Sequence, residues 1–244
     1  MILWLLVRRE LMQLLRSVHG LGPLLLAMAI AGGGLVWLLQ RAEGTVETLP
    51  ALWGVAVSAG LPFLAAVAAS RGFTQDRENG MLRLMFATPV RARTWVMGKV
   101  MAAWWLCVVY VAGMALSCWV LCHWLVPQNA YFPMSWIGFV WAGGALMMLA
   151  WVWCALGTVL SLFSKSSAST FLLSLLGCLF LPPLICEGKV AFGGGLSGQW
   201  RFFPLQELVY DCAGGVVDIR GLVGCAVATV VLVYIGGLIF DALR

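Results

Sequence analysis

The stretch WIGFVWAGGALMMLAWVWCALGTVLSL, Trp136–Leu162, decides the fold, because it has no charged side chain over more than the length of a membrane-spanning helix. About twenty apolar residues suffice for a helix to cross roughly 30 Å of hydrocarbon. The whole chain has the same character: 62% of its 244 residues are apolar, 10% are charged, and its mean hydropathy is +0.97. These values are typical of an integral membrane protein and exclude an ordinary soluble domain.

Apolar runs of comparable length recur along the chain. We expect six membrane-spanning helices, at Leu21–Leu39, Pro50–Ala69, Val100–Leu121, Trp136–Leu162, Ser169–Ile185 and Gly221–Phe240. The runs are too uniformly apolar for the alternating pattern of outer-membrane strands. The sequence therefore predicts an all-α integral membrane protein with a single transmembrane domain over residues 1–244.

The lysines and arginines are distributed unevenly among the predicted loops, and positive charge marks the cytoplasmic side of a membrane protein. With the N-terminus inside, eleven of the 15 basic residues lie on the cytoplasmic side, so we expect both termini there. The eleven are Arg8, Arg9, Arg16, Arg71, Arg77, Arg83, Arg91, Arg93, Lys99, Lys165 and Arg244. The other four are Arg41, Lys189, Arg201 and Arg220. Because the bases lie between apolar runs and not on one aromatic-bearing face, we expect the lipid bilayer, and no nucleic acid, as their partner.

Residues 1–19 form an amphipathic segment before the first span. Apolar residues recur there at helical spacing, namely Leu3, Val7, Leu11, Leu14, Leu15 and Val18. Arg8, Arg9 and Arg16 lie on other faces of the same helix. This pattern predicts an interfacial elbow helix that turns into the membrane near Pro23. An ordinary basic flank to the first span is the alternative.

Between their expected ends, the six spans contain no Asp, Glu, Lys, Arg or His. Proton relays, ion-coupled transporters and intramembrane hydrolases usually need such groups, so the sequence disfavours these classes. His123 has no second histidine or carboxylate close in sequence, which makes a metal site there a weak hypothesis. Cysteines within the spans are expected to pack as small apolar residues: Cys107, Cys118, Cys154, Cys178 and Cys225. A disulfide between Cys186 and Cys212 is a hypothesis for the outer face.

Charged residues gather instead in FTQDRENGMLRLMFATPVRARTWVMGK, Phe73–Lys99. Thr74 or Asp76 can cap a short helix at the start of this stretch. Acidic residues in the first turn are favourable for the helix dipole. Pro89 disfavours continuation of the helix, so we expect it to end at Thr88.

This helix belongs to a predicted cytoplasmic segment over residues 71–99, between the second and third spans. One side of the helix carries Met81, Leu84, Met85 and Thr88. The residues left to face solvent or a docked protein are Asp76, Arg77 and Arg83. Those expected at the level of the lipid phosphates are Arg91, Arg93 and Lys99. A rigid amphipathic helix joined directly to two spans can transmit a displacement, whereas a solvated loop that only sets topology would need none of these features.

The segment resembles a known signature. Phe73, Asp76, Glu78, Gly80, Leu84, Pro89 and the pair Gly98-Lys99 resemble F-x-x-(D/E)-x-E-x-G-x-x-x-L-x-x-x-x-P, ending in G-K, of the permease subunits of ABC-2 type transporters. A second stretch, FFPLQELVYDCAGGVVDIRGLV at Phe202–Val223, is similar to the gliding-motility and nitrous-oxide-maturation branch of that family. The usual pattern in that branch is S-P-x-x-H-F-x-x-x-x-x-G-V-I-D. Here Phe203 stands for the serine, and Glu207-Leu208 replaces His-Phe.

The resemblance implies a permease subunit in a bacterial inner (cell) membrane, paired with a second permease chain, either identical or related. Each permease chain docks a separate ABC ATPase subunit, which binds ATP and Mg, so this chain holds no cofactor and is not itself an enzyme. The chain indeed lacks a G-x-x-x-x-G-K-[ST] loop for phosphates. The residues expected to couple the two subunits are Phe73, Asp76, Arg77, Glu78, Gly80, Met81, Leu84, Met85 and Pro89. An accessory membrane or extracytoplasmic protein is a further partner of such a complex.

Residues 187–220 form the expected extracytoplasmic segment, either as short re-entrant or interfacial helices or as an aromatic belt with a loose loop. The resemblance implies export or extraction, and the charge-free spans favour an amphiphilic or lipid-linked cargo. Two other classes remain open: a non-transporting membrane anchor that transmits ATPase motion to a partner protein, and a membrane-embedded enzyme acting on lipids or prenyl groups. Such an enzyme would need clustered carboxylates or histidines, and Asp76 with Glu78 lacks a D-x-x-D-type metal spacing.

Overall fold

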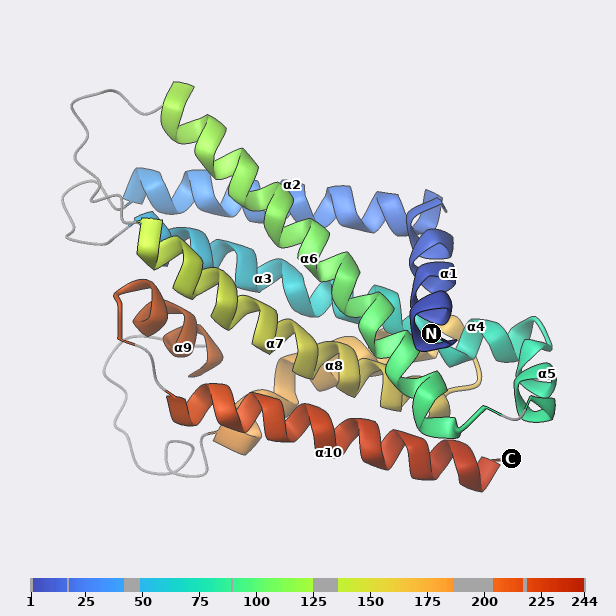
Figure 1. Cartoon of the computed structure of the whole chain (residues 1–244). Helices are drawn as coiled ribbons and strands as arrows, with labels where there is room; N and C mark the ends of the chain where they lie inside the picture. The colour runs from blue at the N-terminus through green and yellow to red at the C-terminus, as the bar shows by residue number, and fades with distance from the viewer. Residues whose placement is uncertain are drawn as a thin grey trace.

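The computed structural model describes residues 2–16, 18–41, 49–88, 90–124, 136–186, 204–216 and 219–243. Every regular element in this part of the chain is a helix, as predicted for an all-α protein. The helices are α1 (Ile2–Arg16), α2 (Val18–Arg41), α3 (Leu49–Ser70), α4 (Phe73–Glu78), α5 (Met81–Ala87), α6 (Ala92–Trp124), α7 (Trp136–Phe163), α8 (Ser167–Cys186), α9 (Pro204–Ala213) and α10 (Ile219–Leu243). Figure 1 shows α3, α7 and α10 running the same way along the bundle, α2 running the opposite way, and α6 inclined across them.

Five helices among the described residues are long and apolar enough to cross a membrane, namely α2, α3, α6, α7 and α10. They contain five of the six predicted spans. The predicted span Ser169–Ile185 falls on α8, of which Ser167–Cys178 counts as a shorter apolar helix. The chain is therefore a multi-pass membrane protein, and a sixth crossing by α8 stays a prediction.

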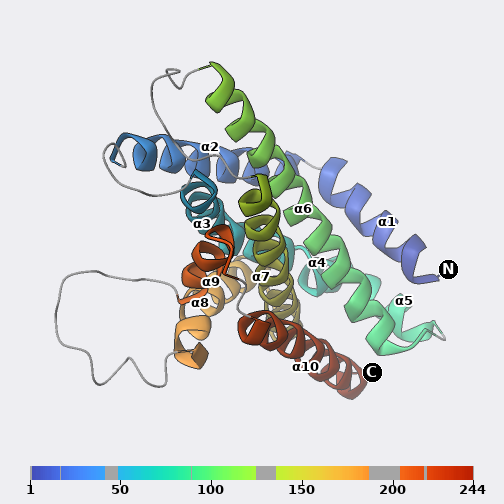
Figure 2. The same ribbon diagram turned by 60° about the vertical axis from the view of Figure 1, so that its left-hand side comes forward.

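The central helix of the bundle is α3. In its apolar stretch 83% of the residues are buried, against 22% in those of α2 and α10. A helix that is apolar all round belongs in the interior, and α3 packs against α2, α6, α7, α8 and α9. Figure 2 shows α3 with α2, α7 and α9 close around it. Small residues along α3, among them Ala56, Gly60 and Ala65, allow these helices to approach closely.

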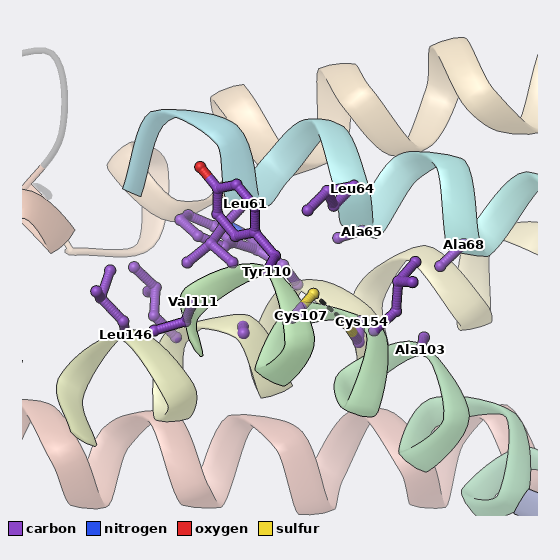
Figure 3. Close-up of a cluster of buried hydrophobic side chains, with 14 of the residues drawn as sticks. Leu61, Leu64, Ala65, Ala68, Ala103, Cys107, Tyr110, Val111, Leu146 and Cys154 are labelled. Atoms are coloured by element: carbon purple, nitrogen blue, oxygen red, sulfur yellow. Dashed lines mark hydrogen bonds between the residues drawn. The ribbon is translucent and has the colours of Figure 1, made fainter. Parts of the chain in front are cut away.

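A cluster of buried side chains from α3, α6 and α7 fills the middle of the bundle (Figure 3). We call it the midspan core, and it includes Leu61, Leu64, Cys107, Tyr110, Leu146 and Cys154. The Tyr110 hydroxyl donates a hydrogen bond of 3.1 Å to the Val57 carbonyl, and its ring end occupies the space that a Cβ on Gly60 would need. The sulfurs of Cys107 and Cys154 lie 3.8 Å apart (Figure 3). Both cysteines thus pack as small apolar residues, as predicted.

Both ends of the described chain lie at one end of the bundle. α1 and the end of α10 are at the same end as α4 and α5, and α1 turns sharply away from the direction of α2 (Figures 1 and 2). Residues 2–16 therefore form a helix separate from the first span. That α1 lies in the membrane interface, and that this end faces the cytoplasm, stay predictions.

The opposite end of the bundle carries α9, which packs against α3 and α7. Leu208, Val209 and Cys212 of α9 are buried, and Val209 fills the space beside Gly54 of α3. Residues 204–213 are therefore a docked helix and not part of a loose loop. The rest of the predicted extracytoplasmic segment up to residue 203, together with the side chain of Cys186, lies outside the described residues. The disulfide between Cys186 and Cys212 stays a prediction.

Candidate functional site at the charged end of the bundle

The charged segment after α3 forms two short helices where one was expected. α4 ends at Glu78, Asn79 and Gly80 make a turn, and α5 begins at Met81. Gly80 has φ +71°, a left-handed backbone conformation that glycine adopts without the steric penalty of a side chain. The prediction of one continuous helix that ends at Thr88 was therefore wrong, because the helix is interrupted at Asn79 and Gly80. The reason is local, since a glycine inside a helical pattern can also mark a break.

The predicted cap by Thr74 or Asp76 is also wrong. α4 begins after Gly72 and has no side-chain hydrogen bond at its cap. Thr74 is fully buried, and its hydroxyl lies 3.2 Å from the Ser161 carbonyl and 2.7 Å from the Thr170 hydroxyl. A buried hydroxyl needs such partners more than the helix terminus needs a cap. Thr74 therefore ties α4 to α7 and α8.

Lys99 lies in the interior of the protein and is 5% exposed, so its ammonium does not face lipid or solvent; that it lies at the level of the lipid phosphates stays a prediction. Its ammonium is 2.6 Å from the Asp76 carboxylate in α4 and 3.3 Å from the Glu10 carboxylate in α1. It also donates a 3.5 Å hydrogen bond to the Gly72 carbonyl and lies 5.1 Å from the centre of the Phe73 ring. A charge this far from solvent requires opposite charges and hydrogen-bond acceptors around it. Asp76, expected to face outward, is one of them.

Glu10 is a functional candidate that the sequence analysis missed. It is 8% exposed and shares a face of α1 with the buried Leu6 and Leu14, four residues to either side. An acid between two leucines on the buried stripe of a helix is a signal that could have identified it. The contact between α1 and α6 is close because Gly98, the residue before Lys99, leaves room for the Leu6 side chain. The pair Gly98-Lys99 is thus where α6 meets α1.

Arg77 and Glu78 complete the ends of two other helices. Arg77 donates hydrogen bonds of 2.8 Å and 2.9 Å to the carbonyls of Ser164 and Leu162, at the C-terminal end of α7. Glu78 accepts hydrogen bonds of 3.0 Å and 2.9 Å from the backbone and hydroxyl of Ser167, the first residue of α8. A base at a helix C-terminus and an acid at an N-terminus both satisfy backbone groups that lack intrahelical partners. Arg77 was expected to face outward and is instead bonded to the end of α7, whereas Glu78 stays exposed while it contacts Ser167.

We call Glu10, Asp76, Arg77, Glu78 and Lys99 the charged junction. Through these five side chains α4 is bonded to α6, to the end of α7 and to the start of α8, and α6 is bonded to α1. Charge-assisted hydrogen bonds are shorter and stronger than neutral ones. The junction therefore fixes α4 relative to four other helices.

α5 and the start of α4 pack against the end of α10. The ring centres of Phe73 and Phe86 each lie 5.2 Å from that of Phe240. Met85 is buried, at 4% exposed, whereas Met81 at the turn is 36% exposed. Of the predicted coupling residues, Phe73 and Met85 face inward and Met81 faces outward, while Pro89 and the side chain of Leu84 lie outside the described residues.

A small cavity adjoins the junction between α1, α3, α6 and α7. Its volume is about 20 Å³, and Glu10, Arg71, Lys99 and Thr158 contribute polar groups to its lining. That volume and lining suit a single water molecule. In the described part of the chain no group of three His, Cys, Asp or Glu residues could hold a metal ion. His123, the weak metal hypothesis, stacks on Trp119 with ring centres 5.8 Å apart.

The sequence matches one family model, described as ABC-2 family transporter protein, over residues 4–191. The matched range includes every residue of the charged junction. A comparison with curated proteins finds no match. The stretch Phe202–Val223 lies beyond the matched range, so its likeness to one branch of transporters stays a prediction.

Proposed function

The chain belongs to the ABC-2 family of transporter proteins, and from this premise we propose that it is a permease subunit driven by a separate ATPase that docks at the turn between α4 and α5. This subunit lies in a bacterial inner membrane with both termini in the cytoplasm. It pairs with a second permease chain and exports or extracts an amphiphilic or lipid-linked cargo. The likeness of Phe202–Val223 supports a place in the gliding-motility and nitrous-oxide-maturation branch.

The observation that carries the proposal is the bonding of α4. Asp76, Arg77 and Glu78 are consecutive residues, and each bonds to a different element, α6, the end of α7 and the start of α8. A displacement of α4 by a docked ATPase would pass to all three at once. A loop without these bonds would absorb the same displacement.

The exposed residues at the turn form the surface offered to the ATPase. They are Gln75, Glu78, Asn79, Gly80 and Met81. Apart from Glu78, which is hydrogen-bonded to Ser167, these residues are neutral, because Asp76 and Arg77 are engaged within the bundle. We therefore expect an apolar and hydrogen-bonding contact with the ATPase, centred on Met81.

The outer faces of the spans support the proposals of an amphiphilic cargo and of a second permease chain. α2 and α10 are mostly exposed, and their large exposed side chains are apolar, for example Leu25, Ile30, Val227 and Val230. Lipid or a second permease chain can cover such faces without burying a charge. An amphiphilic cargo that travels along these faces needs no ionic site within the spans.

The docking proposal is tested by site-specific photo-crosslinking in the native host. A photoreactive amino acid replaces Met81 in one variant and Val216, exposed beyond α9 at the opposite end, in the control. We expect the Met81 probe to crosslink to a protein with a G-x-x-x-x-G-K-[ST] loop and the Val216 probe not to do so. Equal crosslinking from both probes, or none from Met81 in a folded chain, contradicts the proposal.

Transport is distinguished from anchoring by a separate assay. The purified complex is placed in vesicles with a fluorescent lipid, and ATP-dependent movement or release of the lipid is measured. A response to ATP supports an amphiphilic cargo. A complex that hydrolyses ATP without moving lipid, but responds to a small hydrophilic solute, contradicts the cargo proposal.

A further inference from the structure

The face of α1 that points away from the bundle combines apolar and basic side chains. Trp4, Arg8 and Met12 follow one another at intervals of four residues, and Leu5 and Arg9 form the adjacent row. All five are exposed, Trp4 by 62%, Leu5 by 55% and Met12 by 42%. Aromatic and aliphatic groups beside arginines on one helix face are typical of contact with lipid headgroups and the upper acyl chains.

A line of alternating charges leads from this face to α4. The Arg9 guanidinium lies 3.3 Å from Glu10, which lies 3.3 Å from Lys99, which lies 2.6 Å from Asp76. The side chains become more buried from Arg9 to Lys99, from 43% exposed at Arg9 to 10% at Glu10 and 4% at Lys99, and Asp76 is 14% exposed. A surface arginine is thus connected through two contacts to the centre of the charged junction.

We propose that the exposed face of α1 binds anionic phospholipid headgroups through Arg8 and Arg9, and that the occupancy of this site regulates the ATPase contact at α4. The lipid-binding part stands on α1 alone, whereas the regulatory part rests on the proposed function. The ligand is a lipid phosphate, since two arginines offer planar donors for phosphate oxygens and the flanking apolar side chains need acyl chains. A free phosphate ion would leave Trp4, Leu5 and Met12 in water.

The regulation follows from competition for one carboxylate. In the structure Glu10 is shared between Arg9 and Lys99. A lipid phosphate bound to Arg9 leaves Glu10 to Lys99 alone, which strengthens the hold of Lys99 on α1 while Asp76 remains bonded to it. α4 is then fixed more firmly to α1 and α6, so that ATPase motion is transmitted with less loss. Anionic lipid should therefore raise the ATPase rate of the complex.

The lipid site is tested on the purified chain in phosphatidylcholine nanodiscs with and without phosphatidylglycerol, by measuring how much phosphatidylglycerol stays bound after extraction. Arg8→Gln and Arg9→Gln should each weaken retention about fivefold, the effect of one basic residue near an anionic surface. Lys165→Gln is the charge-matched control, because Lys165 is an exposed base in the loop after α7 and not on α1. Unchanged retention in both arginine variants, or an equal loss in the control, overturns the site.

The regulation is tested on the complex with the ATPase in the same nanodiscs. We expect phosphatidylglycerol to raise the ATPase rate several-fold with the native chain. Glu10→Gln should abolish this response while phosphatidylglycerol is still retained, because the variant keeps both arginines. A response that survives Glu10→Gln, or no response despite retained lipid, overturns the regulatory link.

The two proposals fail in different ways. If no ATPase binds the folded chain in any lipid, the proposed function fails, and phosphatidylglycerol retention still decides the lipid site. If the ATPase binds and is active but ignores phosphatidylglycerol, the proposed function stands and the regulation is wrong. Arg8→Gln adds a further check, since it removes a lipid contact without touching the line from Arg9 to Asp76.

Discussion

The midspan core and the charged junction share α6 and α7, and they hold their helices together by different physical means. In the midspan core, α3, α6 and α7 meet through fully buried apolar side chains such as Leu64 and Leu146. At the charged junction, α1, α4, α6, α7 and α8 meet through ion pairs and charge-assisted hydrogen bonds. Apolar packing is non-directional and depends on shape, whereas the polar bonds fix one orientation.

The difference indicates that the two regions have different roles along the bundle. Packing makes the spans a body that moves as a unit, since close-packed interiors transmit strain. The junction sets the angle of α4 on that body, because its bonds require particular partners. Changes at the junction should therefore alter both stability and coupling, while changes in the midspan core should alter stability alone.

The largest effect is expected from Lys99→Met, which breaks the junction at its centre. The variant leaves the Glu10 and Asp76 carboxylates, 10% and 14% exposed, without the ammonium that both contact. Removal of one partner from a buried ion pair costs about 3–5 kcal/mol, and we expect about 3 kcal/mol here because the carboxylates are not fully buried. For a chain of this size that lowers Tm by about 6–12 °C, measured by tryptophan fluorescence of the purified protein.

A compensated variant separates charge from shape in this test. Glu10→Gln and Asp76→Asn, added to Lys99→Met, remove the stranded charges and should recover part of the lost Tm. If the single variant Lys99→Met loses less than about 1 kcal/mol of the free energy of unfolding, Lys99 does not hold the junction together.

The second largest loss of stability is expected from Gly157→Leu, at a position where α7 packs closely against α3. A Cβ at Gly157 would lie 2.8 Å from the Cβ of Ala69 and 3.4 Å from the Ala65 carbonyl, both in α3. Overpacking of a close contact costs about 1–3 kcal/mol. The matched control is Gly143→Leu in the same helix, where nothing lies within 4 Å of the added Cβ. Equal melting shifts for the two variants would contradict the close packing of α3 on α7.

The membrane-spanning helices that form the midspan core were largely predictable from the sequence. Apolar runs placed five spans inside α2, α3, α6, α7 and α10, because the length of a membrane crossing is set by the bilayer. The all-α fold follows from the same constraint, since backbone groups in hydrocarbon must be satisfied within the chain. The contact of Tyr110 over Gly60 was not predictable, because hydropathy does not encode which helices are neighbours.

The charged junction was predicted only in part, since Glu10 was missed. The sequence identified Asp76, Arg77 and Glu78 as coupling residues, and placed Asp76 and Arg77 toward solvent or a docked protein because charged residues usually lie there. Their partners are far away in sequence, so no local pattern reveals them. Glu10, for example, contacts Lys99, 89 positions away, through a side-chain hydrogen bond. The turn at Gly80 was hidden for a related reason, as glycine is compatible with either a helix interior or a break.

A smaller effect on stability, with a clear effect on coupling, is expected from Glu78→Gln. The amide keeps the shape and one acceptor toward Ser167 but loses the charge at the N-terminus of α8, a loss of about 0.5–1 kcal/mol. We expect a Tm close to native and a lowered cargo-stimulated ATPase rate of the complex. Gln75→Ala, at an exposed position of the same helix, is the control.

A double-mutant cycle with Ser167→Ala checks that the bond itself is responsible. If Glu78 acts through Ser167, the double variant should be no worse than the single variants, which gives a coupling energy of about 0.5 kcal/mol or more. Additive losses in the ATPase rate would mean that Glu78 acts elsewhere.

The smallest effect is expected from Tyr110→Phe, which removes the hydrogen bond from the Tyr110 hydroxyl to the Val57 carbonyl and leaves the ring in place. Hydrogen bonds between membrane helices are worth about 0.6 kcal/mol on average, since the alternative states also find partners. We expect a Tm shift that corresponds to this loss of free energy and exceeds that of the control Tyr234→Phe, because Tyr234 is 48% exposed. A loss as large as that of Lys99→Met would mean that directional bonds govern the midspan core as well. The two regions would then differ in composition alone. The orientation of α4 could not be assigned to the charged junction in particular.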